Sequence, residues 1–223
     1  MKRLRVLVAV GVLALASAGA GTAQADPSAW APGGTDCPAA EIFATDNTAV
    51  ITDPADPRLR TRLKRFDHEV REIIRSHGAR PGASTLLDGV FWSENEQQTT
   101  YERSREFDVE EVNADGLHHI ADVIRKQYRQ ESVLTFRCLP RTSPETDAVE
   151  IQAEGVSATR LHDALMADPV ARVRLGGGSV ALDGRLILIA PIADLTLARK
   201  FTARLGVDWN SAEVRYGDEE FVA

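Results

Sequence analysis

The sequence predicts an α+β protein, because segments with the three- and four-residue period of helices alternate with short runs of alternating polar and apolar residues. Residues 48–138 have the order strand, helix, strand, strand, helix, strand, and the same order returns over residues 148–216. This β-α-β-β-α-β order is typical of the ferredoxin-like fold. We therefore expect two tandem ferredoxin-like units, each an antiparallel sheet with its helices on one face.

The first unit begins with a short predicted strand over residues 48–52. A helix follows, whose apolar positions share one face and which ends near Gly78 and Pro81; the face comprises Leu59, Leu63, Phe66, Val70, Ile73, Ile74 and His77. Residues 84–92 and 101–109 are rich in β-branched and aromatic types, and the polar segment between them predicts a hairpin. Asn113 or Asp115 caps a second helix, and residues 133–138 close the unit.

The second strand of this hairpin has two different faces. Alternation places Tyr101, Arg103, Arg105, Phe107 and Val109 on one face, and it places Glu102, Ser104, Glu106 and Asp108 on the other. Neither face is purely apolar, which is typical of a strand at an edge or with one face open to water or a ligand.

In the second unit, residues 148–154 alternate as a strand and Ser157 caps a helix. Asp168-Pro169 indicates a helix restart that runs to Gly176, with a strand as the alternative there. Asp183-Gly184 is a two-residue hairpin turn between strands over residues 179–182 and 185–192. A helix from Asp194 to Gly206 and a short strand over residues 212–216 complete the unit. The two halves share a pattern of elements and almost no sequence.

The N-terminus has the features of a secretory signal peptide. Lys2, Arg3 and Arg5 precede an apolar run over residues 6–15, and Ala23-Gln24-Ala25 is a small-x-small cleavage site. We expect cleavage near Ala25 and export, either secreted or to the exterior of the cell envelope. We expect no transmembrane segment in the mature form.

The predicted organisation is a signal peptide over residues 1–25 and a flexible leader over 26–46. The first ferredoxin-like unit covers residues 47–139, a linker with Pro140 and Pro144 covers 140–147, and the second unit covers 148–223. Removing the signal lowers Lys plus Arg from 26 to 23 against 33 Asp plus Glu, so the mature net charge is −10. This charge argues against nonspecific binding to nucleic acid.

The two cysteines, Cys37 and Cys138, are expected to form a disulfide in an oxidising compartment. In the chain-entropy model, closing a loop of about 100 residues stabilises a fold by up to ~4.7 kcal/mol. A redox-active cysteine is disfavoured, because the chain has no Cys-x-x-Cys motif.

Four motifs carry a resemblance to a known family: Phe66-Asp67-His68-Glu69-Val70, Thr85-Leu86-Leu87-Asp88-Gly89, Glu102-Arg103-Ser104-Arg105, and residues 124–134 with the sequence IRKQYRQESVL. Over roughly residues 66–136 the chain resembles the bacterial domain-of-unknown-function family 3574. The resemblance implies a small exported bacterial domain, and it implies no activity, because that family has no assigned chemistry.

The candidate ligand-binding residues come from the hairpin and from the start of the closing strand: Asp88, Trp92, Tyr101, Arg103, Arg105 and Glu131. An Asp–Arg pair beside aromatic rings suits a polar ligand or a small carboxylate. The alternative is a structural ion pair that fixes the register of the hairpin, and this alternative is favoured.

No catalytic, metal or cofactor motif stands out. His118 and His119 are adjacent and point about 100° apart on a helix, so they do not suit one metal ion. Gly176-Gly177-Gly178 lacks the spacing of a phosphate-binding loop and indicates backbone with positive φ. No serine has the Gly-x-Ser-x-Gly context of a nucleophile elbow. We expect no catalytic residues, metal or cofactor.

The sequence thus predicts an exported, non-catalytic module that binds a small ligand or a protein, and a homodimer is left open. The alternative is a small-molecule enzyme with a cavity between the paired units, which rests on analogy of fold. A third reading is a purely structural pairing of the two halves.

Overall fold

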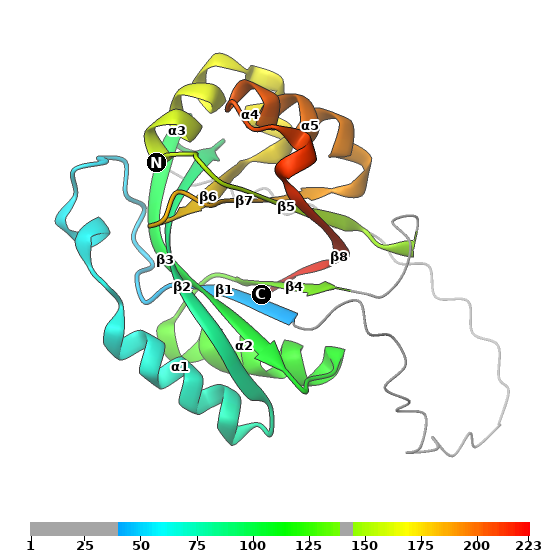
Figure 1. Cartoon of the computed structure of the whole chain (residues 1–223). Coiled ribbons are helices and arrows are strands. Elements are labelled where there is room, and N and C mark those ends of the chain that lie inside the picture. Colours follow the sequence, from blue (N-terminus) through cyan, green and yellow to red (C-terminus); the bar gives the residue numbers. More distant parts are fainter. Residues whose placement is uncertain (1–39, 139–144) are drawn as a thin grey trace, which may run out of the picture. The chain divides into compact units, whose positions relative to one another are not determined.

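The structure, a computed structural model, describes residues 40–138 and 145–223. The strands within these ranges form one closed antiparallel barrel, with the order β1-β3-β2-β6-β7-β5-β8-β4 (Figure 1). Their bounds are β1 Ala40–Ala44, β2 Arg80–Ser93, β3 Gln98–Glu110, β4 Val133–Cys138, β5 Ala148–Ala153, β6 Gly177–Ala181, β7 Leu186–Pro191 and β8 Glu213–Val222.

The helices cover the outside of the barrel in two groups (Figure 1). On one side lie α1 Lys64–Ser76 and α2 Ala114–Tyr128, and on the opposite side lie α3 Ala158–Ala167, α4 Pro169–Leu175 and α5 Leu195–Arg204. Each group packs on its own apolar core. Phe66, Ile74 and Ile124 belong to the first core, whereas Leu161 and Phe201 belong to the second. The barrel interior is therefore a third compartment, separate from both helix-covered cores.

The predicted fold of two separate ferredoxin-like units is wrong. The halves of the chain contribute the strand groups β4-β1-β3-β2 and β8-β5-β7-β6, and these groups do not end in free edges. Strand β2 pairs with β6 from Leu87↔Ala181 to Phe91↔Gly177, and β4 pairs with β8 from Val133↔Val222 to Cys138↔Gly217. An open four-stranded sheet would leave two edges with unpaired backbone groups, and closure pairs these edges over Leu87–Phe91 of β2 and Val133–Cys138 of β4.

Several predicted elements also shift. The first strand is Ala40–Ala44, inside the expected leader, and residues 48–52 contribute only an isolated bridge between Ile51 and Tyr101. The first helix begins at Lys64, because Pro57–Arg60 forms a separate 3₁₀ turn, η1. The Asp183-Gly184 turn is present, with the Ala181 amide donating to the Arg185 carbonyl at 2.8 Å.

Two predictions concern parts of the chain outside the described residues. The signal peptide over residues 1–25 lies there, as does Cys37 of the predicted Cys37–Cys138 disulfide. Among the described residues, no helix has the length and apolar character needed to cross a membrane.

Strand register decides which side chains point into the barrel, because directly paired residues share a face of the sheet. Phe107 and Val109 of β3 belong to the core under α1 and α2, so their face points outward. The intervening positions, Glu102, Ser104, Glu106 and Asp108, point inward. The acidic face of this strand thus lines the interior of the barrel.

Candidate functional site

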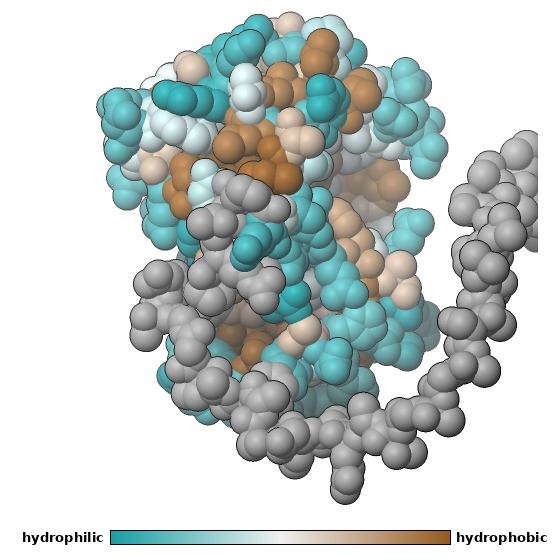
Figure 2. All heavy atoms as spheres, turned by 90° about the vertical axis from the view of Figure 1, so that its right-hand side faces the viewer, coloured by the Kyte–Doolittle hydropathy of each residue, from teal (hydrophilic) through white to brown (hydrophobic). Residues whose placement is uncertain are grey.

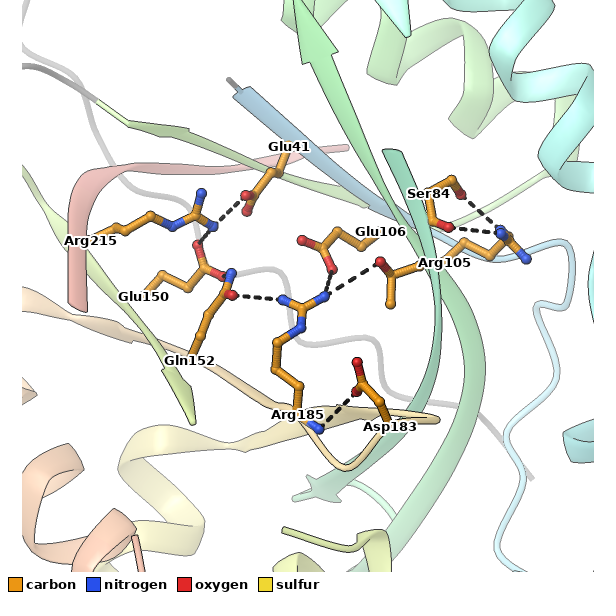
Figure 3. Close-up of polar contacts among 10 residues, drawn as sticks. Glu41, Ser84, Arg105, Glu106, Glu150, Gln152, Asp183, Arg185 and Arg215 are labelled. Carbon is orange, nitrogen blue, oxygen red and sulfur yellow. Dashed lines mark hydrogen bonds and ion pairs between the residues drawn. The ribbon is translucent and has the colours of Figure 1, made fainter. Parts of the chain in front are cut away.

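A network of buried charges fills one part of the barrel interior (Figure 3). The Arg215 guanidinium of β8 donates to both Glu41 of β1 and Glu150 of β5. Glu41 is 2% exposed and Glu150 is fully buried. The amide of Gln152 also donates to Glu150 Oε1 at 2.6 Å. Three strands that are distant in sequence are therefore joined across the barrel by one arginine.

A second arginine extends the network. Arg185 follows the hairpin turn between β6 and β7, and its side chain reaches into the barrel (Figure 3). It donates to Gln152 Oε1 at 2.7 Å, to Glu106 Oε2 at 3.1 Å and to Thr85 Oγ1 at 3.4 Å. These contacts link strands of the first half of the chain to strands of the second.

The network holds more negative than positive charge. Burial, and then the neighbouring Glu150 carboxylate, raise the pKa of Glu41 to about 9, despite the contact with Arg215. Burial also raises the pKa of Glu106 to about 7, with Arg185 acting in the opposite direction. At neutral pH the cluster therefore retains a proton, and Glu41 is the group that carries it.

The same carboxylates raise the question of a metal ion. Oxygen atoms of Glu41, Glu106 and Glu150 lie within 4.8 Å of one another, close enough to share a cation. Two guanidinium groups already contact these three side chains, and the proton on Glu41 removes one of the negative charges. The geometry is therefore that of an internal salt-bridge network, and the positive charge is supplied by the chain itself.

Next to this network the barrel contains a cavity of about 400 Å³. Volumes of this order are typical of small-molecule sites. The apolar residues of its wall are Phe43, Ala44, Phe91, Trp92, Leu134, Leu175, Ile187, Ile189 and Phe221. Ile189 pairs with Glu150 and Ile187 pairs with Gln152, so the salt-bridge network lies directly beside the cavity wall.

Two acids bring negative charge to the cavity wall. They are Glu102 of β3 and Glu219 of β8, and the described lining contains no lysine, arginine or histidine. Desolvation raises the pKa of Glu102, although a hydrogen bond from Ser104 acts against it. Desolvation and the nearby Asp147 raise the pKa of Glu219. The other polar side chains of the wall come from Ser104, Gln130, Ser132 and Ser179.

The glycine run at the start of β6 has a structural role in this wall. Gly177 has φ of +151°, and a Cβ at this position would collide with the Val90 carbonyl and with Phe91 Cα across the β2–β6 seam. The preceding Gly176 accepts a hydrogen bond from the Trp92 amide at 2.6 Å. Glycine at this position thus lets the two halves of the barrel approach closely. The positive φ predicted for the glycine run is present at Gly176 and Gly177.

Of the predicted site residues, Trp92 is the one that lines the cavity. Its ring also lies under the Arg172 guanidinium, 4.1 Å from the ring centroid. Asp88 and Arg103 form the predicted ion pair, but on the outer face of the sheet, where Arg103 Nε donates to the Thr61 carbonyl at 2.9 Å. These contacts match the structural alternative for the Asp–Arg pair.

Arg105 also lies on the outer face. It donates to the Ser84 hydroxyl at 2.9 Å and to the Arg62 carbonyl at 3.1 Å, and it pairs with Asp67 at 3.3 Å. These bonds tie the hairpin to α1 and to the segment that precedes it.

Tyr101 and Glu131 line a second, more open pocket of about 430 Å³, which shares Phe91, Glu102, Gln130 and Ser132 with the cavity wall. The Tyr101 ring stacks on His162 at 6.1 Å. The structure therefore distributes the six predicted residues over several places and does not bring them together around one ligand.

Apart from Trp92, the residues that surround the cavity were missed, although one signal was present in the sequence. Alternation along β3 had already separated Glu102, Ser104 and Glu106 from the arginines. What the pattern did not contain was the closure of the barrel, which turns this acidic face into an interior wall. Arg215 and Glu41 are 174 positions apart, and nothing local connects them.

Comparisons with known proteins add little to this geometry. No family model matches the chain, and no curated protein matches it. The resemblance to family 3574 therefore stays a prediction. One solved structure, from Lactobacillus acidophilus and described as a "putative monooxygenase", aligns over 82% of this chain and 94% of that protein, at 9% identity and a TM-score of 0.25. A similarity this weak supports no conclusion about fold or function.

Proposed function

We propose that the protein is an exported, non-catalytic binding protein that holds a small, largely apolar ligand inside its barrel. The observation that carries the proposal is the cavity of about 400 Å³, with its apolar wall and few polar groups. Export is supported by the signal-peptide pattern of residues 1–25.

The surroundings of the cavity favour a preformed site. One part of its wall adjoins the salt-bridge network, whose hydrogen bonds and ion pairs join β1, β3, β5 and β8. Other parts of the wall come from both halves of the chain, since Phe43 and Leu134 line it together with Ile187 and Phe221. A wall held by closed backbone pairing reduces the ordering cost of binding.

The second candidate is a small-molecule enzyme that uses the same cavity. It is favoured by Glu102, whose raised pKa in a desolvated wall is typical of catalytic acids and bases. Among the described lining residues, however, no histidine, cysteine or lysine accompanies it. A substrate whose turnover is lost in Glu102→Gln, with binding retained, would favour the enzyme over the binding protein.

Prodan, a neutral dye whose emission depends on polarity, tests the proposed function. We expect saturable binding to one site per chain with a blue-shifted emission. Leu134 is half-buried and points into the cavity opposite Phe43 and Phe221, so Leu134→Trp should fill the space and reduce dye binding at least about tenfold.

The control for this experiment is Leu182→Trp, which adds the same ring at a position that is 56% exposed and outside the cavity lining. It should bind the dye like the wild type. Equal binding by both variants, or no saturable binding by the wild type, would contradict a ligand site in the barrel.

A further inference from the structure

The structure points to a more specific ligand, and this inference rests on the proposed function. We propose that the barrel selects an organic cation, an amine with an apolar body, whose ammonium group pairs with Glu102. The apolar body would lie among the phenylalanine and isoleucine side chains of the cavity wall.

The charge of the cavity wall favours a cationic ligand. Glu102 and Glu219 are its ionisable groups among the described lining residues, and both are acids. An anionic ligand would place its negative charge beside two acids and no basic side chain of the described lining. A neutral apolar ligand would displace water from the carboxyl groups and leave them without new partners, which is costly. A cation provides the missing partner for either acid.

The position of Glu102 next to an aromatic ring also favours an ammonium group. Glu102 points into the barrel opposite Gly89 of β2, which has no side chain to cover it. The Phe91 ring lies over Gly89, because a Cβ there would collide with this ring and would approach Glu102 Cβ to 3.2 Å. The carboxyl group and an aromatic ring are therefore neighbours on the cavity wall. This combination suits an ammonium group, which is attracted to both.

Further aromatic rings support the same chemistry. Phe43 and Phe221 also line the cavity, from β1 and β8. Trp92 of β2 borders it as well, although alternation along β2 places the Trp92 side chain on the outer face of the sheet, with Asp88. Trp92 already contacts a cation of the chain itself, the Arg172 guanidinium, at 4.1 Å. Arg172 is outside the cavity lining, so it does not neutralise the acids of the wall.

The surroundings of Glu102 also favour a cationic partner. Desolvation raises the pKa of this carboxyl group, and the Ser104 hydroxyl compensates only in part. A bound ammonium group would favour the ionised carboxylate and lower its pKa. Amine binding should therefore be accompanied by proton release when Glu102 begins in its protonated form.

Three small probes of nearly the same shape test the proposal by displacement of prodan or by calorimetry. They are 2-phenylethylamine, 2-phenylethanol and 3-phenylpropanoate, which are cationic, neutral and anionic at pH 7. We expect the amine to bind at least about tenfold more tightly than the alcohol, and the anion to bind most weakly, since ion-paired hydrogen bonds are stronger than neutral ones.

The variant Glu102→Gln keeps the size of the side chain and removes its charge. It should weaken amine binding at least about tenfold and should not weaken alcohol binding, so that the preference for the amine is lost. Glu220→Gln is the matched control, because Glu220 pairs with Thr135 on the outer face and contacts His118 at 2.8 Å, away from the cavity.

The outcomes separate the inference from the proposed function. Prodan binding without preference for the amine, or an amine affinity that Glu102→Gln does not change, would overturn the organic-cation ligand and leave the binding cavity in place. Failure of prodan and of all three probes would overturn the proposed function itself.

Discussion

Replacing Arg215 by methionine should destabilise the barrel strongly. The Arg215 side chain is 19% exposed, and its guanidinium is shared by Glu41 and Glu150, which are 3% and 0% exposed. Methionine retains most of the apolar stem and removes the charge. Glu150 then remains buried without its cationic partner, next to a second carboxyl group.

The expected cost follows from the burial of the pair. Removing one partner of a buried ion pair costs about 3–5 kcal/mol, because the remaining charge is uncompensated. For a domain of this size, each kcal/mol lowers Tm by about 2–4 °C. We therefore expect Tm of Arg215→Met to fall by about 6–20 °C at pH 7, measured by thermal melting followed by circular dichroism and checked by urea unfolding.

Two further variants make this result interpretable. The double variant Arg215→Met/Glu150→Gln should regain a large part of the loss, because it removes the charge that the single variant leaves unpaired. The exposed Arg58, which pairs with Asp56 at the surface, provides the control, and Arg58→Met should leave Tm nearly unchanged. The reasoning is refuted if Arg215→Met melts like the Arg58 variant.

Three further predictions concern pH, the seam of the barrel and the outer ion pair. The pKa of Glu41 is raised in the folded state from 4.5 to about 9, so the folded protein binds more protons in this window and its free energy of unfolding should fall as pH rises from about 4.5 to 9. Glu41→Gln should flatten this dependence in urea titrations, and an unchanged slope would contradict the assignment. Tm of Gly177→Ala should be well below Tm of Gly155→Ala. Both glycines have positive φ, but of the two only Gly177 has atoms within 4 Å of an added Cβ. Equal Tm values of the two variants would show that the β2–β6 seam tolerates a side chain. Arg103→Ala should lower Tm and leave prodan binding intact, because Arg103 pairs with Asp88 on the outer face of the sheet. A variant that melts like the wild type but binds no dye would place this arginine in the ligand site.

Local pattern was sufficient for much of the secondary structure. The helical stripe that includes Phe66 and Ile74, the hairpin of β2 and β3, and the Asp183-Gly184 turn all follow from spacing and turn chemistry. The alternation along β3 also separated its two faces correctly, since register alone sets which residues share a face.

Closure could not be predicted in the same way. The pairings of β2 with β6 and of β4 with β8 join strands that are far apart in the sequence, and no local pattern indicates them. Strand β1 was missed because its five residues stand in a segment rich in proline and glycine, and its pairing with β3 and β4 selects it over residues 48–52. Tertiary pairing overrides a short local signal in both cases.

The candidate site was harder still. The arginines beside aromatic residues on β3 were predicted to bind a ligand, whereas Arg103 and Arg105 make structural contacts on the outer face. Glu102 is a candidate because it lines a cavity inside the barrel, and the pattern of a single strand does not predict that cavity. Chemistry that arises from closure becomes visible only once the fold is known.

The most direct test of the account is methyl NMR of the protein labelled at isoleucine and leucine, titrated with 2-phenylethylamine. We predict that the methyl groups of Leu134, Ile187 and Ile189, which line the cavity, shift with a common dissociation constant. Methyl groups of Ile74 and Leu161, buried under the two helix layers, should stay nearly unchanged. Shifts confined to the helix-covered cores or to the outer surface, or no saturable shift at the cavity methyls, would contradict a ligand site inside the barrel.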